Sequence, residues 1–333
     1  MSVNRRVLMA KHPDAEPTDD CFTVDEVPVP EIGDGEALVA VRYLSVDPAQ
    51  RMWMNPGGVY NMGAQVGAPM MSVGFGEVVA SRSSGYAVGS TVNGMLGWQQ
   101  YAVIDGDTRR AAPVPAGIDG PAALGVFGMN GQTAYWGLYD IGRPQPGETV
   151  LVSAAAGATG SLVGQLARIA GARVVGLASS AAKRDWIRDE LGFDEAIDYR
   201  ADDLPQQLDK ACPDGVNVYF DNVGGVILDL ALERLAMRGR VVLCGAISAY
   251  NTNTPGPGPS RYRQLIRQRG RMEGFIVMDY APRYGEALAR LREWEADGRL
   301  RHREDVVRGL DNAPEALRRV LRGDHLGKLI VAV

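Results

Sequence analysis

Cysteine and histidine are scarce in this chain of 333 residues, which contains three of each. They are Cys21, Cys212, Cys244, His12, His302 and His325. The cysteines lie far apart and form no C-x-x-C pair, which excludes a disulfide framework and a cysteine-rich metal site. A catalytic zinc ion needs about three protein ligands from cysteine, histidine and carboxylates, and the sequence contains no such cluster. We therefore expect a metal-independent protein of the reducing cytoplasm.

Long hydrophobic runs and an excess of positive charge are also missing. The longest apolar region, 150–178, is interrupted by Gln165, Arg168 and Arg173, so it is not a credible membrane span. The short apolar run at 7–10 is too small for the core of a signal peptide. The net charge of −5 argues against a nucleic-acid-binding surface, which needs clustered positive charge.

Glycine, by contrast, is abundant, with 41 residues, and the two halves of the chain show different patterns. Residues 1–125 are typical of a β-rich domain, with strands expected at 37–44, 74–80, 91–96 and 100–104 between turn signals. The stretch 55–69 is rich in glycine and polar residues, and we expect it to be a loop.

Near Gly131 the pattern changes to strands that alternate with amphipathic helices. Strands are expected at 149–154, 173–178, 216–221, 240–244 and 272–277, and helices at 160–170, 181–191, 202–211 and 226–236. This alternation predicts an α/β fold, with a doubly wound parallel sheet of the Rossmann type covered on both faces. We assign residues 126–298 to this domain. Residues 299–333 follow, with a capped helix at 312–321 and a final strand at 328–333.

The most specific local signal is the run Ala154-Ala155-Ala156-Gly157-Ala158-Thr159-Gly160, which joins an expected strand to an expected helix. Gly157 would let the backbone approach a pyrophosphate, and Gly160 would let the helix pack closely on the strand. The N-terminus of the helix would present unpaired N–H groups to the phosphates. Alanine replaces the first glycine of the G-x-G-x-x-G pattern, so a tight turn built only for packing is the alternative. The strand before, the helix after and the βα units downstream favour dinucleotide binding.

The end of the next expected strand indicates which dinucleotide is bound. An NAD site requires an acidic residue there to hold the ribose 2′-hydroxyl, whereas this strand ends in Ser179-Ser180. Lys183 and Arg184 follow within one helical turn, and hydroxyls with a cation suit a 2′-phosphate. The alternative is that Ser180 only caps a helix and both cations are solvated. We expect NADP(H) as the cofactor.

These features resemble the medium-chain dehydrogenase/reductase superfamily, and within it the zinc-free group of prostaglandin, alkenal double-bond and curcumin reductases. The resemblance covers nearly the whole chain. It includes Asp47-Pro48, Gly128-Met129-Asn130-Gly131, Asp221-Asn222-Val223-Gly224-Gly225, Cys244-Gly245-Ala246-Ile247-Ser248 and Leu326-Gly327-Lys328. In zinc-dependent relatives a cysteine and a histidine ligand fall near 45–47 and 74–77, and both are absent here. The group also implies a GroES-like substrate domain, to which the C-terminal segment 299–333 returns, and a homodimer.

The resemblance also implies roles for single residues. Tyr250 would be the catalytic hydroxyl that polarises the substrate. The cofactor would be bound by Asn130, Thr133, Gly157, Ala158, Thr159, Gly160, Ser179, Lys183, Tyr199, Asn222, Cys244, Gly245, Ala246, Ile247, Ser248, Tyr250, Phe275, Ile276, Val277 and His325. Two residues depart from the pattern: Ala49 replaces the usual tyrosine, which would enlarge the substrate pocket, and His325 replaces the usual asparagine at the nicotinamide.

Several residues have two open interpretations. Tyr60, Tyr135 and Tyr262 are weaker candidates for substrate contact, and Tyr135 in a helix is more typical of a core. The basic run 261–271 is typical of a solvated helical face, or it attracts an anionic or CoA-like substrate. The proline- and glycine-rich segment 254–259 is either a mobile lid or a rigid series of turns.

The sequence therefore predicts an enzyme that uses NADPH to reduce the carbon–carbon double bond of an α,β-unsaturated ketone or aldehyde. Hydride would reach the β-carbon, and Tyr250 would stabilise the enolate. An NADPH:quinone oxidoreductase is the enzymatic alternative, and a non-catalytic NADPH-binding regulator is the alternative from another class.

Overall fold

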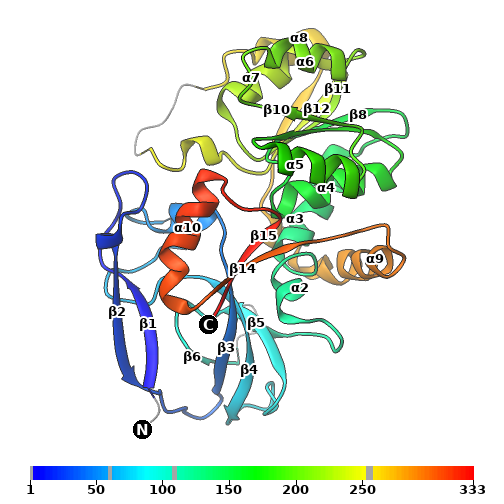
Figure 1. Ribbon diagram of the computed structural model, residues 1–333. Coiled ribbons are helices and arrows are strands. Elements are labelled where there is room, and N and C mark those ends of the chain that lie inside the picture. Colours follow the sequence, from blue (N-terminus) through cyan, green and yellow to red (C-terminus); the bar gives the residue numbers. More distant parts are fainter. Residues whose placement is uncertain (1–2, 59–61, 107–110, 253–257) are drawn as a thin grey trace. The chain divides into compact units, whose positions relative to one another are not determined.

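A computed structural model describes residues 3–58, 62–106, 111–252 and 258–333 of the chain (Figure 1). The chain forms two compact units, residues 126–303 and residues 1–125 with 304–333. The second border lies at 303/304 rather than at the expected 298/299. Residues 300 and 301 stay with the 126–303 unit because the backbone of Arg301 forms hydrogen bonds of 2.7 and 2.9 Å with the side-chain amide of Gln165.

The 126–303 unit is built on a parallel six-stranded sheet in the order β10-β9-β8-β11-β12-β13. Its strands are β8 (Thr149–Val152), β9 (Arg173–Ala178), β10 (Glu195–Asp198), β11 (Val216–Asp221), β12 (Leu235–Leu243) and β13 (Arg271–Gly274). The chain runs outward from β8 to β10 and then crosses to β11, so the order reverses between β8 and β11. Ligands of doubly wound sheets bind at this reversal, outside the carboxyl ends of the strands.

Helices cover both faces of this sheet. The helices of the unit are α3 (Met129–Trp136), α4 (Ala158–Ile169), α5 (Ala181–Asp185), α6 (Leu204–Ala211), α7 (Gly225–Glu233), α8 (Arg263–Gln268) and α9 (Tyr284–Ala296). Figure 1 shows α4 and α5 on one side of the strands and α6, α7 and α8 on the other. Because helices cover both faces, the strands of this sheet are buried on both sides. In β8, for example, all four residues are buried.

The other unit is dominated by antiparallel pairing. Its main sheet has seven strands in the order β14-β15-β3-β4-β5-β7, with β6 paired to β3, and β1 and β2 form a separate pair. The strands are β1 (Val3–Met9), β2 (Phe22–Pro28), β3 (Ala37–Ser45), β4 (Val73–Ser81), β5 (Thr91–Met95), β6 (Tyr101–Ile104), β7 (Ala111–Pro113), β14 (Glu304–Arg308) and β15 (Lys328–Ala332), and the helices are α1 (Ala49–Trp53), α2 (Gly120–Leu124) and α10 (Ala313–Arg322). The C-terminal strand β15 pairs with β3, which returns the chain end to this unit.

The predicted fold class is confirmed, whereas several expected bounds are wrong. The expected strand 240–244 begins five residues earlier, at Leu235, because Arg238 with φ 59° lets the strand continue through a bulge-like irregularity. The expected strand 272–277 ends at Gly274, and a 3-10 helix follows at Val277–Arg283. The expected helix 181–191 changes to a π-helical turn at Trp186–Glu190. In the part of the chain that the structure describes, no helix has the length and apolarity needed to cross a bilayer.

Candidate active site

The dinucleotide loop connects the end of β8 to the start of α4. Ala154 has φ 48°, a left-handed conformation that is unusual for a residue with a side chain. The turn closes through a hydrogen bond of 3.0 Å from Gly157 N to Ala154 O, and Gly157 is the N-cap of α4. The first N–H groups of the twelve-residue helix α4 therefore open beside this turn, where they can meet a phosphate charge.

Gly160 is required at its position by space. A Cβ atom built there would lie 2.4 Å from Ala154 O and 2.9 Å from Ala155 Cα. Both neighbours are backbone atoms of the loop, so neither can move aside without opening the turn. Gly160 therefore permits a close approach of the helix to the loop, whereas the sequence predicted a close approach of the helix to the strand.

Asn222 ties the loop after β11 to the loop after β8. Its side-chain amide donates to Ser153 O at 2.7 Å, and its backbone N–H donates to Ser153 Oγ at 2.9 Å. Asn130, on α3, donates to Thr159 Oγ1 at 3.4 Å, so it reaches the first turn of α4. Thr133 bonds back to Met129 O within α3. Asn130 thus contacts the segment expected to hold the pyrophosphate, and Asn222 contacts Ser153, the residue that precedes this segment.

A buried carboxylate that sequence reasoning missed organises this edge of the sheet. Asp221 Oδ1 accepts hydrogen bonds from Tyr219 Oη at 2.8 Å, Val223 N at 2.9 Å and Gly224 N at 2.8 Å. Its other oxygen, Oδ2, is buried without a hydrogen-bond partner among the described residues. Burial raises the pKa of Asp221 although these donors oppose the shift. The position of Asp221 at the end of an apolar strand, beside glycines, was the available signal.

The region expected to hold the 2′-phosphate follows β9 and β10. Ser180 caps α5, because its hydroxyl accepts a hydrogen bond from Lys183 N at 3.3 Å. This cap was the alternative interpretation of Ser180. Arg184 forms an ion pair of 2.7 Å with Asp198, at the end of β10, and is therefore committed to that carboxylate. Arg200, which the sequence analysis did not single out, lies over the ring of Tyr199, with 5.4 Å from Cζ to the ring centre.

The loop after β12 carries Tyr250 and packs on the loop after β11. Cys244 N and Gly245 N both donate to Asp221 O, at 2.9 and 3.0 Å. Ile247 N donates to Asn222 O at 3.3 Å, and Ser248 Oγ donates to Val223 O at 2.6 Å. Residues 244–248 are therefore joined to the Asp221–Asn222 turn by direct bonds.

Within that loop, the Tyr250 hydroxyl folds back on its own backbone. Ala246 N donates to Tyr250 Oη at 3.2 Å, and a Cβ on Gly245 would lie 3.1 Å from the same oxygen. Burial, with a contribution from the Asp221 carboxylate, raises the pKa of the nearby Cys244 thiol to about 12, so this cysteine is a packing residue and not a thiolate.

The remaining expected residues are placed as follows. The ring of Phe275 packs against Tyr280, with 6.4 Å between ring centres, and fills the space beside Gly137. Tyr135 packs among Trp136, Tyr139 and Trp294, which favours the core interpretation. Tyr262 is 57% exposed. Ala49 begins α1 and His325 precedes β15, both in the other unit. Tyr60 and most of segment 254–259 lie outside the described residues.

The ammonium group of Lys328 lies beside residues 45–47. Lys328 Nζ lies 2.7 Å from Asp47 Oδ1 and 2.9 Å from Val46 O, and the Ser45 hydroxyl also donates to Asp47. Burial lowers the pKa of Lys328, and Asp47 opposes that shift. Across residues 3–58, 62–106, 111–252 and 258–333, no three histidine, cysteine, aspartate or glutamate side chains are grouped to hold a metal ion. The described residues therefore do not fit a catalytic zinc.

Comparison with known proteins agrees with this geometry. Residues 5–111 match the family described as N-terminal domain of oxidoreductase, and residues 158–293 match the family described as zinc-binding dehydrogenase. The NADPH-dependent curcumin reductase of Escherichia coli is 38% identical over 99% of this chain and 97% of its own length. The chain belongs to the prostaglandin and curcumin reductase group of the medium-chain dehydrogenases/reductases.

Two further members of this group extend the comparison. The NADP(+)-dependent 2-alkenal reductase of Nicotiana tabacum is 36% identical over 99% of this chain and 97% of its own length. The crystal structure of CurA from Vibrio vulnificus in complex with NADPH superposes with a TM-score of 0.93, at 39% identity and 99% coverage of both chains. This chain is accordingly an NADPH-dependent oxidoreductase, and NADP(H) is its cofactor. The loop that contains Gly157 and Gly160, together with the N-terminus of α4, fits that cofactor.

Proposed function

We propose that this enzyme reduces the carbon–carbon double bond of α,β-unsaturated ketones or aldehydes. The observation that carries the proposal is the place of Tyr250, whose hydroxyl lies in the loop after β12, and this loop is hydrogen-bonded to the turn that follows β11. Relatives named as 2-alkenal and curcumin reductases support the substrate class. When bound, NADPH supplies the hydride that the β-carbon accepts.

In this proposal the chain's residues provide position and charge. The N–H groups at the start of α4 hold the pyrophosphate, and Asn130 and Asn222 fix the loop that presents them. Tyr250 donates its hydroxyl hydrogen to the carbonyl oxygen, where negative charge grows as the β-carbon is reduced. Because Tyr250 Oη accepts from Ala246 N, its O–H bond is polarised and becomes a stronger donor. The proton for the α-carbon comes from solvent or through the same hydroxyl.

Preference for NADPH is assigned to Lys183, with Ser179 and Tyr199 beside the 2′-phosphate. Because Arg184 is paired with Asp198, we assign the second cation of this site to Arg200, next to Tyr199. The backbone of 244–248, together with 275–277 and His325, is assigned to the nicotinamide end, and Ala49, Tyr60 and Tyr262 to the substrate. The proposal extends to metal-independent action in the cytoplasm as a homodimer.

The test is a substrate panel applied to the wild-type enzyme and to Tyr250→Phe. NADPH oxidation would be followed with a trans-2-alkenal, a quinone and, in reverse, an alcohol with NADP⁺. We expect the alkenal to be reduced, and Tyr250→Phe to lower its turnover by about 10²–10³-fold, the usual effect of losing one oxyanion donor. A second donor, from the ribose of the cofactor, would limit the loss to about tenfold. Quinone turnover should change less.

The matched control is Tyr101→Phe, which removes a hydroxyl from β6 in the other unit and should leave both activities unchanged. NADPH affinity of Tyr250→Phe should also be unchanged, because the ring is kept. Unchanged alkenal turnover would make Tyr250 a packing residue, and a protein that reduces only quinones would replace the proposed substrate class.

A further inference from the structure

A pocket lined by five arginines lies at the amino ends of the sheet strands, opposite the dinucleotide loop. It has a volume of about 500 Å³ and is lined by Arg143, Gln145, Glu148, Arg238, Arg240, Arg269 and Arg271. Glu148 immediately precedes β8, and Arg271 begins β13, so the pocket faces the edge where these strands start. It is therefore separate from the cofactor site, which follows the carboxyl ends of the same strands.

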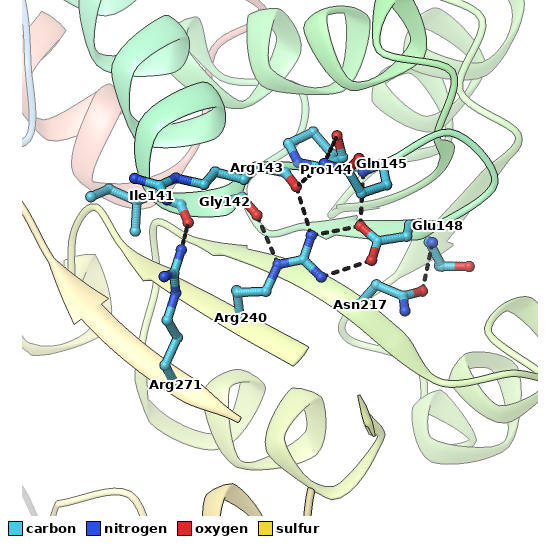
Figure 2. A network of polar contacts seen from close by, with 10 residues as sticks. Ile141, Gly142, Arg143, Pro144, Gln145, Glu148, Asn217, Arg240 and Arg271 are labelled. Atoms are coloured by element: carbon cyan, nitrogen blue, oxygen red, sulfur yellow. Dashed lines mark hydrogen bonds and ion pairs between the residues drawn. The ribbon is translucent and has the colours of Figure 1, made fainter. Parts of the chain in front are cut away.

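Arg240, one of the lining residues of this arginine pocket, lies at the centre of a network of polar contacts (Figure 2). Its guanidinium donates to both carboxylate oxygens of Glu148, at 2.8 and 2.6 Å, and to the carbonyls of Gly142 and Arg143, at 2.9 and 2.8 Å. Glu148 is the only carboxylate among the lining residues, and Arg240 neutralises it. The other four arginines are left to determine the charge of the pocket.

Those four arginines are only partly occupied by neighbouring acids. Arg143 lies 3.6 Å from an oxygen of Asp140, and Arg271 lies 3.7 Å from Glu273. Arg269 donates to Arg267 O at 2.9 Å and has no carboxylate within 4 Å among the described residues. The Arg238 guanidinium makes no hydrogen bond or ion pair with the described part of the chain. The positive charge is thus concentrated on the Arg238 and Arg269 side of the pocket.

Backbone conformation provides a second, independent observation. Four non-glycine residues of the described chain have positive φ, and three of them line this pocket: Arg143 at 47°, Arg238 at 59° and Arg269 at 50°. Left-handed backbone costs about 1 kcal/mol or more for a residue with a side chain. Where α10 ends, the chain places Gly323 in this conformation. A helix dipole favours a cation at the ends of helices, as for Arg143 after the π-helical turn Gly137–Gly142 and Arg269 after α8. Arg238 lies within β12 and has no such compensation.

We propose that the arginine pocket is a binding site for a small anion that carries two or more phosphate groups, distinct from the NADP(H) site. The guanidinium group matches phosphate oxygens in pairs, and several converging arginines match more than one phosphate. The volume of about 500 Å³ is sufficient for a small anion bound in an open depression. Five arginines gather in this depression on a chain of net charge −5, which favours a small ligand over a nucleic acid.

The test is calorimetric titration of inorganic tripolyphosphate into the full chain saturated with NADP⁺, which blocks the dinucleotide loop. One tripolyphosphate should bind per chain. Arg238→Gln combined with Arg269→Gln should weaken this binding about tenfold or more, because each substitution removes a charge-assisted contact. Glutamine keeps a side chain at the left-handed positions, so the backbone is not relaxed. The control, Arg292→Gln, removes an exposed arginine of α9 outside the pocket and should bind as the wild type does.

Two further measurements complete the test. Titration with ATP distinguishes a nucleotide from a phosphate chain, and the unfolding temperature of a single variant shows whether the fold is kept. ATP that binds tighter than tripolyphosphate would assign the phosphates to a nucleotide, whereas equal affinity would assign them to the phosphate chain alone. The single variant Arg238→Gln should retain the native unfolding temperature and lose part of the affinity. Absent binding, binding abolished by NADP⁺, equal binding by the double variant, or tighter arginine-dependent binding to duplex DNA would overturn the proposal.

Discussion

The two ends of the parallel sheet present different kinds of group to a charged ligand. At the carboxyl ends, small residues and the N-terminus of α4 leave backbone N–H groups, which we propose bind the cofactor phosphates. At the amino ends, arginine side chains surround a pocket with a single carboxylate. The four left-handed non-glycine residues of the described chain divide between these places, with Ala154 at the first and three arginines at the second.

The carboxylates at the two ends show the same contrast. Burial raises the pKa of Asp221, although backbone and side-chain donors surround one of its oxygens. Burial would also raise the pKa of Glu148, but hydrogen bonds from Arg240 and the Gln145 N–H outweigh it, and the pKa lies below its ordinary value. Asp221 is fully buried, whereas the Glu148 side chain is 20% exposed and faces a full guanidinium charge, and these two differences together keep the Glu148 carboxylate ionised. The predictions below test this difference, from the largest expected effect to the smallest.

Removal of the buried Asp221 should have the largest effect. Asp221→Ala leaves Tyr219 Oη, Val223 N and Gly224 N without their acceptor, and should lower the free energy of unfolding by about 3 kcal/mol or more. Asp221→Asn keeps an acceptor at Oδ1 and places an amide where Oδ2 has no partner, so its stability should stay within about 1 kcal/mol of the wild type. Urea unfolding of both variants at neutral pH measures this. Equal losses would mean that the charge, and not the acceptor, matters.

Insertion of a side chain at Gly160, in the dinucleotide loop, should have the second largest effect. A Cβ there lies 2.4 Å from Ala154 O, so Gly160→Val should force the loop open and weaken NADPH binding about a hundredfold. Gly285→Val, in the first turn of α9, is the matched control, because a Cβ at Gly285 meets no atom within 4 Å. Fluorescence titration with NADPH compares them. Native affinity in Gly160→Val would show that the loop does not hold the pyrophosphate.

Sequence patterns predicted the dinucleotide loop at the carboxyl ends of the strands much better than the arginine pocket at their amino ends. The strand–loop–helix unit around Gly157 and Gly160 is contiguous, and its periodicity and glycine spacing are local properties. The left-handed conformation of Ala154 was not predictable, because only the surrounding packing imposes it on a residue with a side chain. The importance of Asp221 depends on N–H groups that point at one oxygen, which the residue type alone does not reveal.

The arginine pocket was not predictable because its residues come from distant segments. Arg240 and Glu148 are 92 positions apart and meet only after β12 is paired with β11, which is itself paired with β8. The basic run 261–271 was visible, but helix α8 directs some of its members elsewhere, and only Arg269 and Arg271 line the pocket. The strands β1 and β2, which are separated by 12 residues, and their antiparallel pairing were also not predicted.

Glu148→Gln tests the ion pair at the amino ends of the strands. It should lower the free energy of unfolding by about 2 kcal/mol at pH 7, because it leaves Arg240 largely buried without its counter-charge. The pKa of Glu148 is lowered in the folded state, so its stabilisation is complete above the ordinary glutamate range and is lost as pH falls through the lowered value. The difference between wild type and variant should therefore shrink below about pH 4. Glu195→Gln, which breaks the exposed pair with Arg173, should cost at most about 0.5 kcal/mol. A pH-independent difference in Glu148→Gln would indicate a loss of shape and not of charge.

The smallest effect is expected at Lys183, where a side-chain cation, and not a backbone N–H group, is proposed to meet a phosphate at the carboxyl ends of the strands. Lys183→Ala removes one charge-assisted contact to the 2′-phosphate and should weaken NADPH binding about tenfold, while NADH binding barely changes because NADH lacks that phosphate. Arg200→Ala should have the same selectivity with a smaller loss, because its guanidinium lies over the Tyr199 ring. Arg184→Ala is the contrasting variant: it leaves Asp198 without its partner and should affect stability more than cofactor choice. Affinities for NADPH and NADH, measured side by side, separate these roles. Equal losses for the two cofactors in Lys183→Ala would make Lys183 a structural residue of α5 and leave Arg200 as the residue that selects the phosphate.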